Sequence, residues 1–181
     1  MGKNIYQITD EFEDKLANYT GAKYAITVDN MSNGLFLSLY YENHIKNRIK
    51  NKTVICPSRT YPSVPCEIIH AGLKIEWDEV DGETLTGAYQ LKGSRVWDAA
   101  LTFTADMFIP KSHMCISFTG PYKHFKLSKG GAILTDDLKA YQWSRGLLLM
   151  GQFYNIDGSR KHQEDLTLPY PDLSKFKIYN Q

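Results

Sequence analysis

Two ionisable residues, Asp98 and Lys123, each follow a run of apolar residues. Asp98 ends a short apolar run, and Lys123 comes after a second β-type run, residues 114–118, and a Gly-Pro turn. A strand-end aspartate followed by a loop lysine is what a pyridoxal phosphate (PLP) site requires. The aspartate keeps the pyridine nitrogen protonated, and the lysine forms a Schiff base with the cofactor. The sequence therefore predicts a PLP site on these two residues.

Alternating strands and helices must position the two residues. Apolar runs bounded by glycine or proline predict strands, and apolar residues at helical spacing predict helices. Their alternation indicates an α/β fold with a mainly parallel sheet and helices on both faces. The predicted strands cover residues 24–28, 53–56, 73–77, 96–98, 114–118 and 131–135, and the predicted helices cover residues 9–19, 35–46, 61–71 and 136–150. The third of these helices is expected to start near Pro62 or Pro65.

Several polar segments follow directly after predicted strands. They comprise a polar turn at residues 29–34, the segment 57–61, Asp98 and the segment 117–123. Ligands of such sheets bind at the carboxyl ends of the strands. We therefore expect these segments to meet at one edge of the sheet and to form a single site.

Composition argues against several other classes of protein. The chain has 181 residues, 43% apolar and 23% charged, which suggests one soluble domain. Its net charge of +1 gives no sign of a nucleic-acid or membrane partner. No apolar stretch is long enough to span a bilayer, and the N-terminus lacks the apolar core of a signal peptide. We expect residues 1–150 to form the domain and residues 151–181 to form an irregular tail.

The cysteines point to a reducing compartment. There are three, Cys56, Cys66 and Cys115, and an odd number of thiols does not suit a disulfide framework. We therefore expect a cytoplasmic protein. Cys56, Cys66 and His70 match no zinc spacing, so we expect no metal site.

Four short motifs follow one another along the chain. They are Pro57-Ser58-Arg59-Thr60-Tyr61, His70-Ala71-Gly72-Leu73-Lys74, Asp98-Ala99-Ala100, and Ser117-Phe118 followed by Lys123 and Gly130-Gly131. Each motif is short, but their order and approximate spacing together are fairly specific. Through them the sequence resembles, from about residue 12 to about residue 150, the DegT/DnrJ/EryC1/StrS sugar aminotransferases, which are PLP-dependent enzymes of fold type I.

The resemblance implies a role for each residue of the reacting centre. Lys123 would form the Schiff base and then act as general acid and base, with Lys126 as the competing candidate. Asp98 would pair with the pyridinium nitrogen, and Tyr61 would stack on the ring. The large domain would have the aspartate aminotransferase-like fold of PLP-dependent transferases.

The resemblance also implies a phosphate site. Ser32 and Ser117 would contact the phosphate, helped by backbone N–H groups at the start of the helix after Ser32. Met31 stands where the family usually has a glycine, and it would crowd the phosphate. The implied activity moves an amino group from an amino acid such as glutamate to a keto-sugar nucleotide, in a homodimer.

Departures from the family pattern leave other hypotheses open. Leu101 replaces a hydrogen-bonding residue, Gly120-Pro121 is inserted before the lysine, the stretch from residue 80 to residue 98 is short, and the family's C-terminal small domain is missing. A catalytically retired protein of the same fold, acting as a binding or assembly module, is the second hypothesis. A cofactor-free α/β domain with chance motif matches is the third.

Each candidate residue also has a purely structural explanation. Lys123 could lie in a solvated loop, Asp98 could cap a helix, and Tyr61 could pack in the core. Ser32 could cap the helix that follows it, a role compatible with phosphate binding because both use the same N–H groups.

Overall fold

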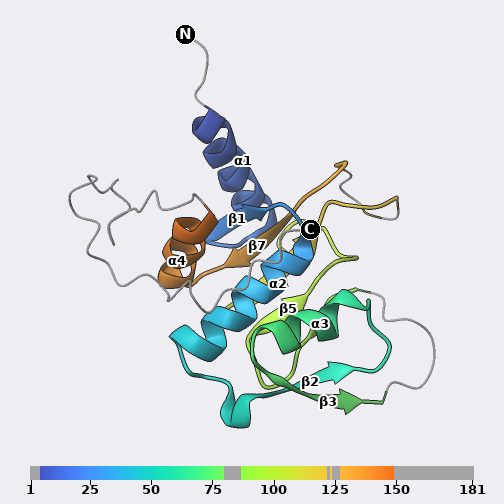
Figure 1. Cartoon of the computed structure of the whole chain (residues 1–181). Coiled ribbons are helices and arrows are strands. Elements are labelled where there is room, and N and C mark those ends of the chain that lie inside the picture. The colour runs from blue at the N-terminus through green and yellow to red at the C-terminus, as the bar shows by residue number, and fades with distance from the viewer. Residues whose placement is uncertain (1–4, 80–86, 122, 124–126, 149–181) are drawn as a thin grey trace, which may run out of the picture.

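The computed structural model describes residues 5–79, 87–121, 123 and 127–148, and Figure 1 draws the whole chain. The α/β class is confirmed, and no helix within these ranges is long and apolar enough to cross a membrane. The strands are β1 (Tyr24–Val28), β2 (Thr53–Pro57), β3 (Lys74–Asp78), β4 (Tyr89–Gln90), β5 (Val96–Asp98), β6 (His113–Ser117) and β7 (Gly131–Thr135). The helices are α1 (Ile5–Thr20), α2 (Met31–Tyr40), α3 (Ser63–His70) and α4 (Leu138–Leu148), with a π-helical turn at Tyr41–Ile45 and a 3-10 turn at Lys50–Lys52.

The main sheet is mixed, which corrects the expectation of a mainly parallel one. Its strand order is β1-β7-β6-β5-β4, and only β5 and β6 are parallel neighbours. Strand β7 runs antiparallel between β1 and β6. A parallel return needs a crossover, usually a helix, and no helix is found in the described part of the loop 118–130. The loop therefore returns the chain at the edge of the sheet where β6 ends.

A hairpin adds β4 to β5. Gly93 turns this hairpin at φ +89°, a conformation that favours glycine. A Cβ atom at Gly93 would lie 3.1 Å from the carbonyl oxygen of Thr53, at the start of β2. Strands β2 and β3 form a separate parallel pair, and the Ile55 N–H bonds the Lys92 carbonyl across the gap at 2.9 Å.

Helices cover both faces of the main sheet, as the sequence predicted. Met114 and Leu134 belong to one apolar cluster, which includes Leu16 of α1. Their neighbours Cys115 and Ile133 belong to the other cluster, with α2 and α3. Because successive residues of a strand point to opposite faces, these two clusters mark the two sides of the sheet. Figure 1 shows α2 lying across the sheet next to α3, with α1 and α4 near β1.

The segment expected as a polar turn is the first turn of α2. Asn30 has an extended backbone and caps the helix, because its side-chain oxygen accepts a hydrogen bond from the Asn33 N–H at 2.9 Å. The helix therefore begins at Met31 and not at residue 35, and Ser32 lies inside it. The third helix begins at Ser63, directly after Pro62, which was one of its two predicted starts.

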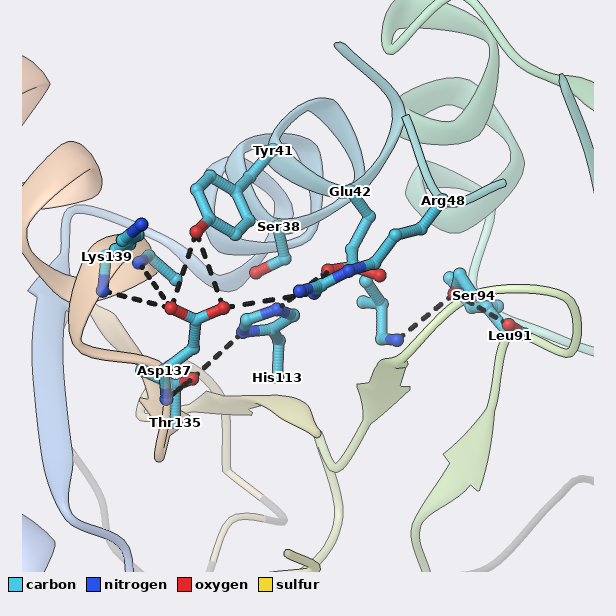
Figure 2. Close-up of polar contacts among 12 residues, drawn as sticks. Ser38, Tyr41, Glu42, Arg48, Leu91, Ser94, His113, Thr135, Asp137 and Lys139 are labelled. Carbon is cyan, nitrogen blue, oxygen red and sulfur yellow. Dashed lines mark hydrogen bonds and ion pairs between the residues drawn. The ribbon is translucent and has the colours of Figure 1, made fainter. Parts of the chain in front are cut away.

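A buried cluster of ionisable side chains links the π-helical turn after α2 with the start of β6. Figure 2 shows the side chains involved. Glu42, with 0% exposure, forms ion pairs with His113 Nε2 at 3.2 Å and Arg48 Nη1 at 2.7 Å. His113 Nδ1 contacts the Thr135 hydroxyl at 3.0 Å. Burial by itself would raise the pKa of Glu42, but the hydrogen bonds and charges of His113 and Arg48 outweigh it and lower the pKa.

Candidate active site

A pocket of about 780 Å³ opens at the carboxyl ends of β5 and β6. The N-termini of α2 and α3 form its other wall. All the residues that the sequence analysis assigned to the site line this pocket, although their roles stay predictions. These residues are Met31, Ser32, Tyr61, Asp98, Ser117 and Lys123.

Asp98 is a buried carboxylate with neutral partners. It is 4% exposed. Its Oδ1 accepts the Ala100 N–H at 2.8 Å, and its Oδ2 accepts the Tyr89 hydroxyl at 2.7 Å. Burial raises the pKa of Asp98, and the two hydrogen bonds together with the charge of Lys123 offset only part of that rise. The helix-cap alternative is wrong, because residues 99–104 form a turn and no helix.

Lys123 shares the pocket with Asp98 and is half-buried. Its Nζ donates a hydrogen bond to the Ala100 carbonyl oxygen at 2.7 Å. Ala100 thus links the pair, since its N–H binds Asp98 and its carbonyl binds Lys123. Burial lowers the pKa of Lys123, and the charge of Asp98 opposes this effect. A lowered pKa favours the neutral amine that a nucleophilic lysine needs, and the bond to Ala100 distinguishes Lys123 from a fully solvated loop residue. The competitor Lys126 lies outside the described residues.

Tyr61 and Leu101 present apolar surface to the pocket. Tyr61 is 74% exposed, so the alternative that it packs in the core is wrong. An exposed aromatic face is suited to stacking on a planar ring. Leu101 is 39% exposed and lines the same pocket, where its side chain offers no hydrogen bond.

Two helix N-termini supply donors on the opposite wall. The first-turn N–H groups of Met31 and Ser32 have no acceptor within α2, and such groups favour anions. The Ser32 hydroxyl donates to the Ser63 hydroxyl at 2.9 Å, and Ser63 opens α3. Ser117, at the end of β6, accepts the Thr119 N–H at 3.3 Å.

Backbone packing fixes this wall. Met31 is 8% exposed and belongs to the core cluster under α2. A Cβ atom added to Gly131 would lie 2.9 Å from the Met31 nitrogen and 2.6 Å from the Ile116 carbonyl oxygen. Only glycine at this position lets the start of α2 approach β6 and β7 so closely.

Several further pocket residues were not predicted as site residues, and five of them carry polar side chains of interest. Tyr89 is the most telling, because its contact with Asp98 depends on the β4–β5 register. The Gly93-Ser94 pair between two short apolar segments was the available signal for that hairpin. The five residues are Arg59, Thr60, Ser63, Tyr89 and Lys129.

The side chains of this pocket fit PLP by their chemistry. Asp98 is an acceptor without an ion-pair partner among the described cations, which suits a protonated ring nitrogen. Lys123 supplies an amine, and Tyr61 supplies an exposed ring. The helix N-termini and serine hydroxyls supply donors for a phosphate.

The fold and the pocket together define an α/β domain with a pocket at the carboxyl ends of β5 and β6, the place where such sheets bind ligands. The model of the DegT/DnrJ/EryC1/StrS aminotransferase family matches residues 2–91 of the sequence. Over these residues the chain is similar to this family, as its motifs indicated. No curated protein matched the sequence.

Solved structures of similar fold include sugar-modifying enzymes. Helicobacter pylori PseC, an aminotransferase involved in the biosynthesis of pseudoaminic acid, matches with a TM-score of 0.66 at 11% identity, over 89% of this chain and 52% of PseC. The E. coli GDP-4-keto-6-deoxy-D-mannose-3-dehydratase, solved with bound hydrated PLP, matches with a TM-score of 0.64 at 18% identity, over 92% of this chain and 54% of the dehydratase.

A third structure is DesI, solved in the presence of its TDP-sugar product. Its TM-score is 0.58 at 21% identity, and the match covers 84% of this chain and 47% of DesI. These likenesses show that the described domain has the fold of PLP-dependent aminotransferases. The chain spans about half the length of the solved structures that it matches.

Proposed function

We propose that this chain forms the PLP-binding large domain of a sugar aminotransferase. The observation that carries the proposal is the pairing of Asp98 and Lys123 in one pocket, joined through the two peptide groups of Ala100. The match of residues 2–91 to the aminotransferase family model supports the same activity. When bound, PLP supplies the electron sink that makes amino-group transfer possible.

The residues of the pocket would divide the work. Asp98 would hold a proton on the pyridine nitrogen, and Lys123 would bind the cofactor covalently through Nζ and then move a proton at that same atom. Tyr61 would stack on the ring. Ser32, Ser117 and the start of α2 would hold the phosphate.

The charge of the pocket supports an anionic substrate. Its charged lining residues are Arg59, Lys123 and Lys129, against the single acid Asp98. Among the described residues, Arg59 and Lys129 have no hydrogen-bond or ion-pair partner, so both are available to a ligand. A keto-sugar nucleotide carries a diphosphate that such cations bind. The similarity to DesI, solved with a TDP-sugar product, supports this substrate class.

An amino acid such as glutamate would donate the amino group. A homodimer would complete the site, because the resemblance implies that the family builds it at a subunit interface. The openness of the pocket toward Tyr61, which is 74% exposed, supports a partner surface there. The tail expected at residues 151–181 lies outside the described residues.

Leu101 favours a second candidate function. An apolar side chain lines the pocket where the family resemblance led us to expect a hydrogen-bonding residue. A retired protein of the same fold would keep the pocket and use it for binding or assembly. The two candidates differ in whether a bound cofactor reacts with an amino donor.

Absorbance spectroscopy with borohydride trapping tests the proposal. PLP is added to the wild type, to Lys123→Ala and to the control Lys139→Ala, which changes an exposed lysine of α4. We expect a visible band and, after reduction, a pyridoxyl group on the peptide that contains Lys123, in the wild type and the control alone. Loss of the band on addition of glutamate supports transamination, whereas a band that glutamate leaves unchanged supports the retired candidate. Trapping at another lysine contradicts the assignment of Lys123.

A further inference from the structure

Asp98 lies at the end of a chain of hydroxyl groups that no predicted role explains. The Tyr89 hydroxyl donates to Asp98 Oδ2 at 2.7 Å, and the Thr60 hydroxyl lies 2.5 Å from the Tyr89 oxygen. Tyr89 is paired directly opposite Asp98 in the register of β4 and β5. Thr60 comes from a different part of the fold, the loop after β2. Two separate segments therefore converge behind one carboxylate.

The number of hydroxyl protons fixes which group donates in each of these hydrogen bonds. A tyrosine hydroxyl has one proton, and Tyr89 uses it to bind Asp98. Thr60 must then donate its own proton to the Tyr89 oxygen. Hydrogen bonds aligned in this way polarise one another, so Thr60 strengthens the bond from Tyr89 to Asp98.

These hydrogen bonds leave the Asp98 carboxylate able to accept another donor. Tyr89 binds Oδ2, and the Ala100 N–H binds Oδ1. A carboxylate offers about four acceptor positions, so each oxygen keeps a second lone pair. Asp98 itself lines the pocket, where a ligand can reach those lone pairs.

On the basis of the proposed function, we infer that Tyr89 is a positioning residue, backed by Thr60, which keeps the Asp98 carboxylate ionised and oriented to receive the protonated ring nitrogen of the cofactor. Burial raises the pKa of Asp98, and its hydrogen bonds from Ala100 and Tyr89 oppose that rise. Ala100 donates through its backbone and is hard to remove. Tyr89 is therefore the side chain whose loss changes Asp98 most.

Nuclear magnetic resonance of the cofactor-free full chain tests this role. Aspartate labelled with ¹³C at the carboxyl is titrated in the wild type, Tyr89→Phe and Thr60→Val. The control Tyr24→Phe removes a hydroxyl from β1, outside the residues that line the pocket. We expect Tyr89→Phe to raise the pKa of Asp98 by about 1 or more, because a hydrogen bond to a charged group is lost. Thr60→Val raises it less, and Tyr24→Phe leaves it unchanged.

Cofactor binding gives a second readout on the same variants. We expect Tyr89→Phe to bind PLP about tenfold more weakly than the wild type, since one charge-assisted bond is weakened. Borohydride should still attach the cofactor to Lys123. A merely structural tyrosine would change neither the pKa of Asp98 nor the PLP affinity at constant fold.

The outcomes separate this inference from the proposed function. An unchanged pKa of Asp98 in Tyr89→Phe overturns the inference even if the wild type binds PLP. If the wild type binds no PLP, the proposed function fails, and the cofactor-directed role of Tyr89 fails with it. Should Tyr89→Phe not fold, Thr60→Val decides: a raised pKa of Asp98 supports the inference, and an unchanged one rejects it.

Discussion

Glu42 and Asp98 are both buried carboxylates, but they lie at opposite ends of the parallel strands β5 and β6. Glu42 binds His113 at the start of β6, whereas Asp98 ends β5, the parallel neighbour of β6. Glu42 has two cationic partners, Arg48 and His113 when it is protonated (Figure 2). The partners of Asp98 are a hydroxyl and a peptide N–H.

The pKa shifts of the two acids run in opposite directions. Burial acts on both acids, yet the partners of Glu42 lower its pKa, while that of Asp98 stays raised. A buried charge is costly unless a partner compensates it. The cluster around Glu42 is compensated within the protein and serves the fold. Asp98 faces a pocket and has no ion-pair partner among the described cations, which is the condition expected of a ligand-binding group.

Removing Glu42 should have the largest effect on stability. Glu42→Ala strands the polar groups of His113 and Arg48, and breaking a buried ion pair in this way costs about 3–5 kcal/mol. Denaturant unfolding at pH 7 measures the loss. The control Glu79→Ala changes an exposed acid and should alter the free energy of unfolding by about 0.5 kcal/mol or less. Equal values for the two variants would refute the structural role of Glu42.

Crowding the pocket wall should have an intermediate effect. Gly131→Ala brings a Cβ atom against backbone atoms of Ile116 and Met31, and such overpacking costs about 1–3 kcal/mol. Because the start of α2 must shift, PLP affinity should fall as well. The control Gly34→Ala meets the flexible side chain of Ile133 at 3.3 Å and should cost less. A Gly131→Ala protein as stable as the wild type would argue against the close approach.

The two acids should affect the pH dependence of stability in opposite directions. The raised pKa of Asp98 means that ionisation of this acid disfavours the folded state. Asp98 therefore lowers stability as the pH rises above 3.8, the ordinary pKa of an aspartate. The lowered pKa of Glu42 means that this acid contributes stability above 4.5, which is lost as the pH falls.

Unfolding curves between pH 3 and pH 7 test these slopes. Relative to the wild type, Asp98→Asn should gain stability as the pH rises through this range. Glu42→Gln should lose stability relative to the wild type over the same rise. Parallel curves for all three proteins would show that the two carboxylates do not differ as described.

The sequence was informative where candidate site residues come at or just after the end of a strand. Asp98 ends a predicted strand, Ser117 is the next-to-last residue of another, and Lys123 follows in the next loop, so their convergence on one pocket could be predicted and is observed. The six predicted strands are all found, with ends shifted by at most one residue. Local apolar patterns suffice for such elements.

The sequence was uninformative where long-range pairing decides. The direction of β7 depends on how the loop 118–130 returns, and the contact between Tyr89 and Asp98 depends on a two-residue strand. His113 and Glu42 are 71 residues apart, and neither showed a pattern. At the start of α2, the sequence offered Ser32 as the helix cap, but Asn30 is the cap, because its backbone is extended and its side chain accepts the Asn33 N–H.

The most direct test of the account is a PLP titration of three proteins: wild type, Asp98→Asn and Glu42→Gln. Absorbance gives the dissociation constant of each under conditions where all are folded. We predict that Asp98→Asn raises it by about tenfold to a hundredfold, since a charged hydrogen-bond partner is lost. Glu42→Gln should stay within about twofold of the wild type, because Glu42 does not line the pocket. Equal affinity of Asp98→Asn and the wild type would contradict the claim that Asp98 is there to receive the cofactor.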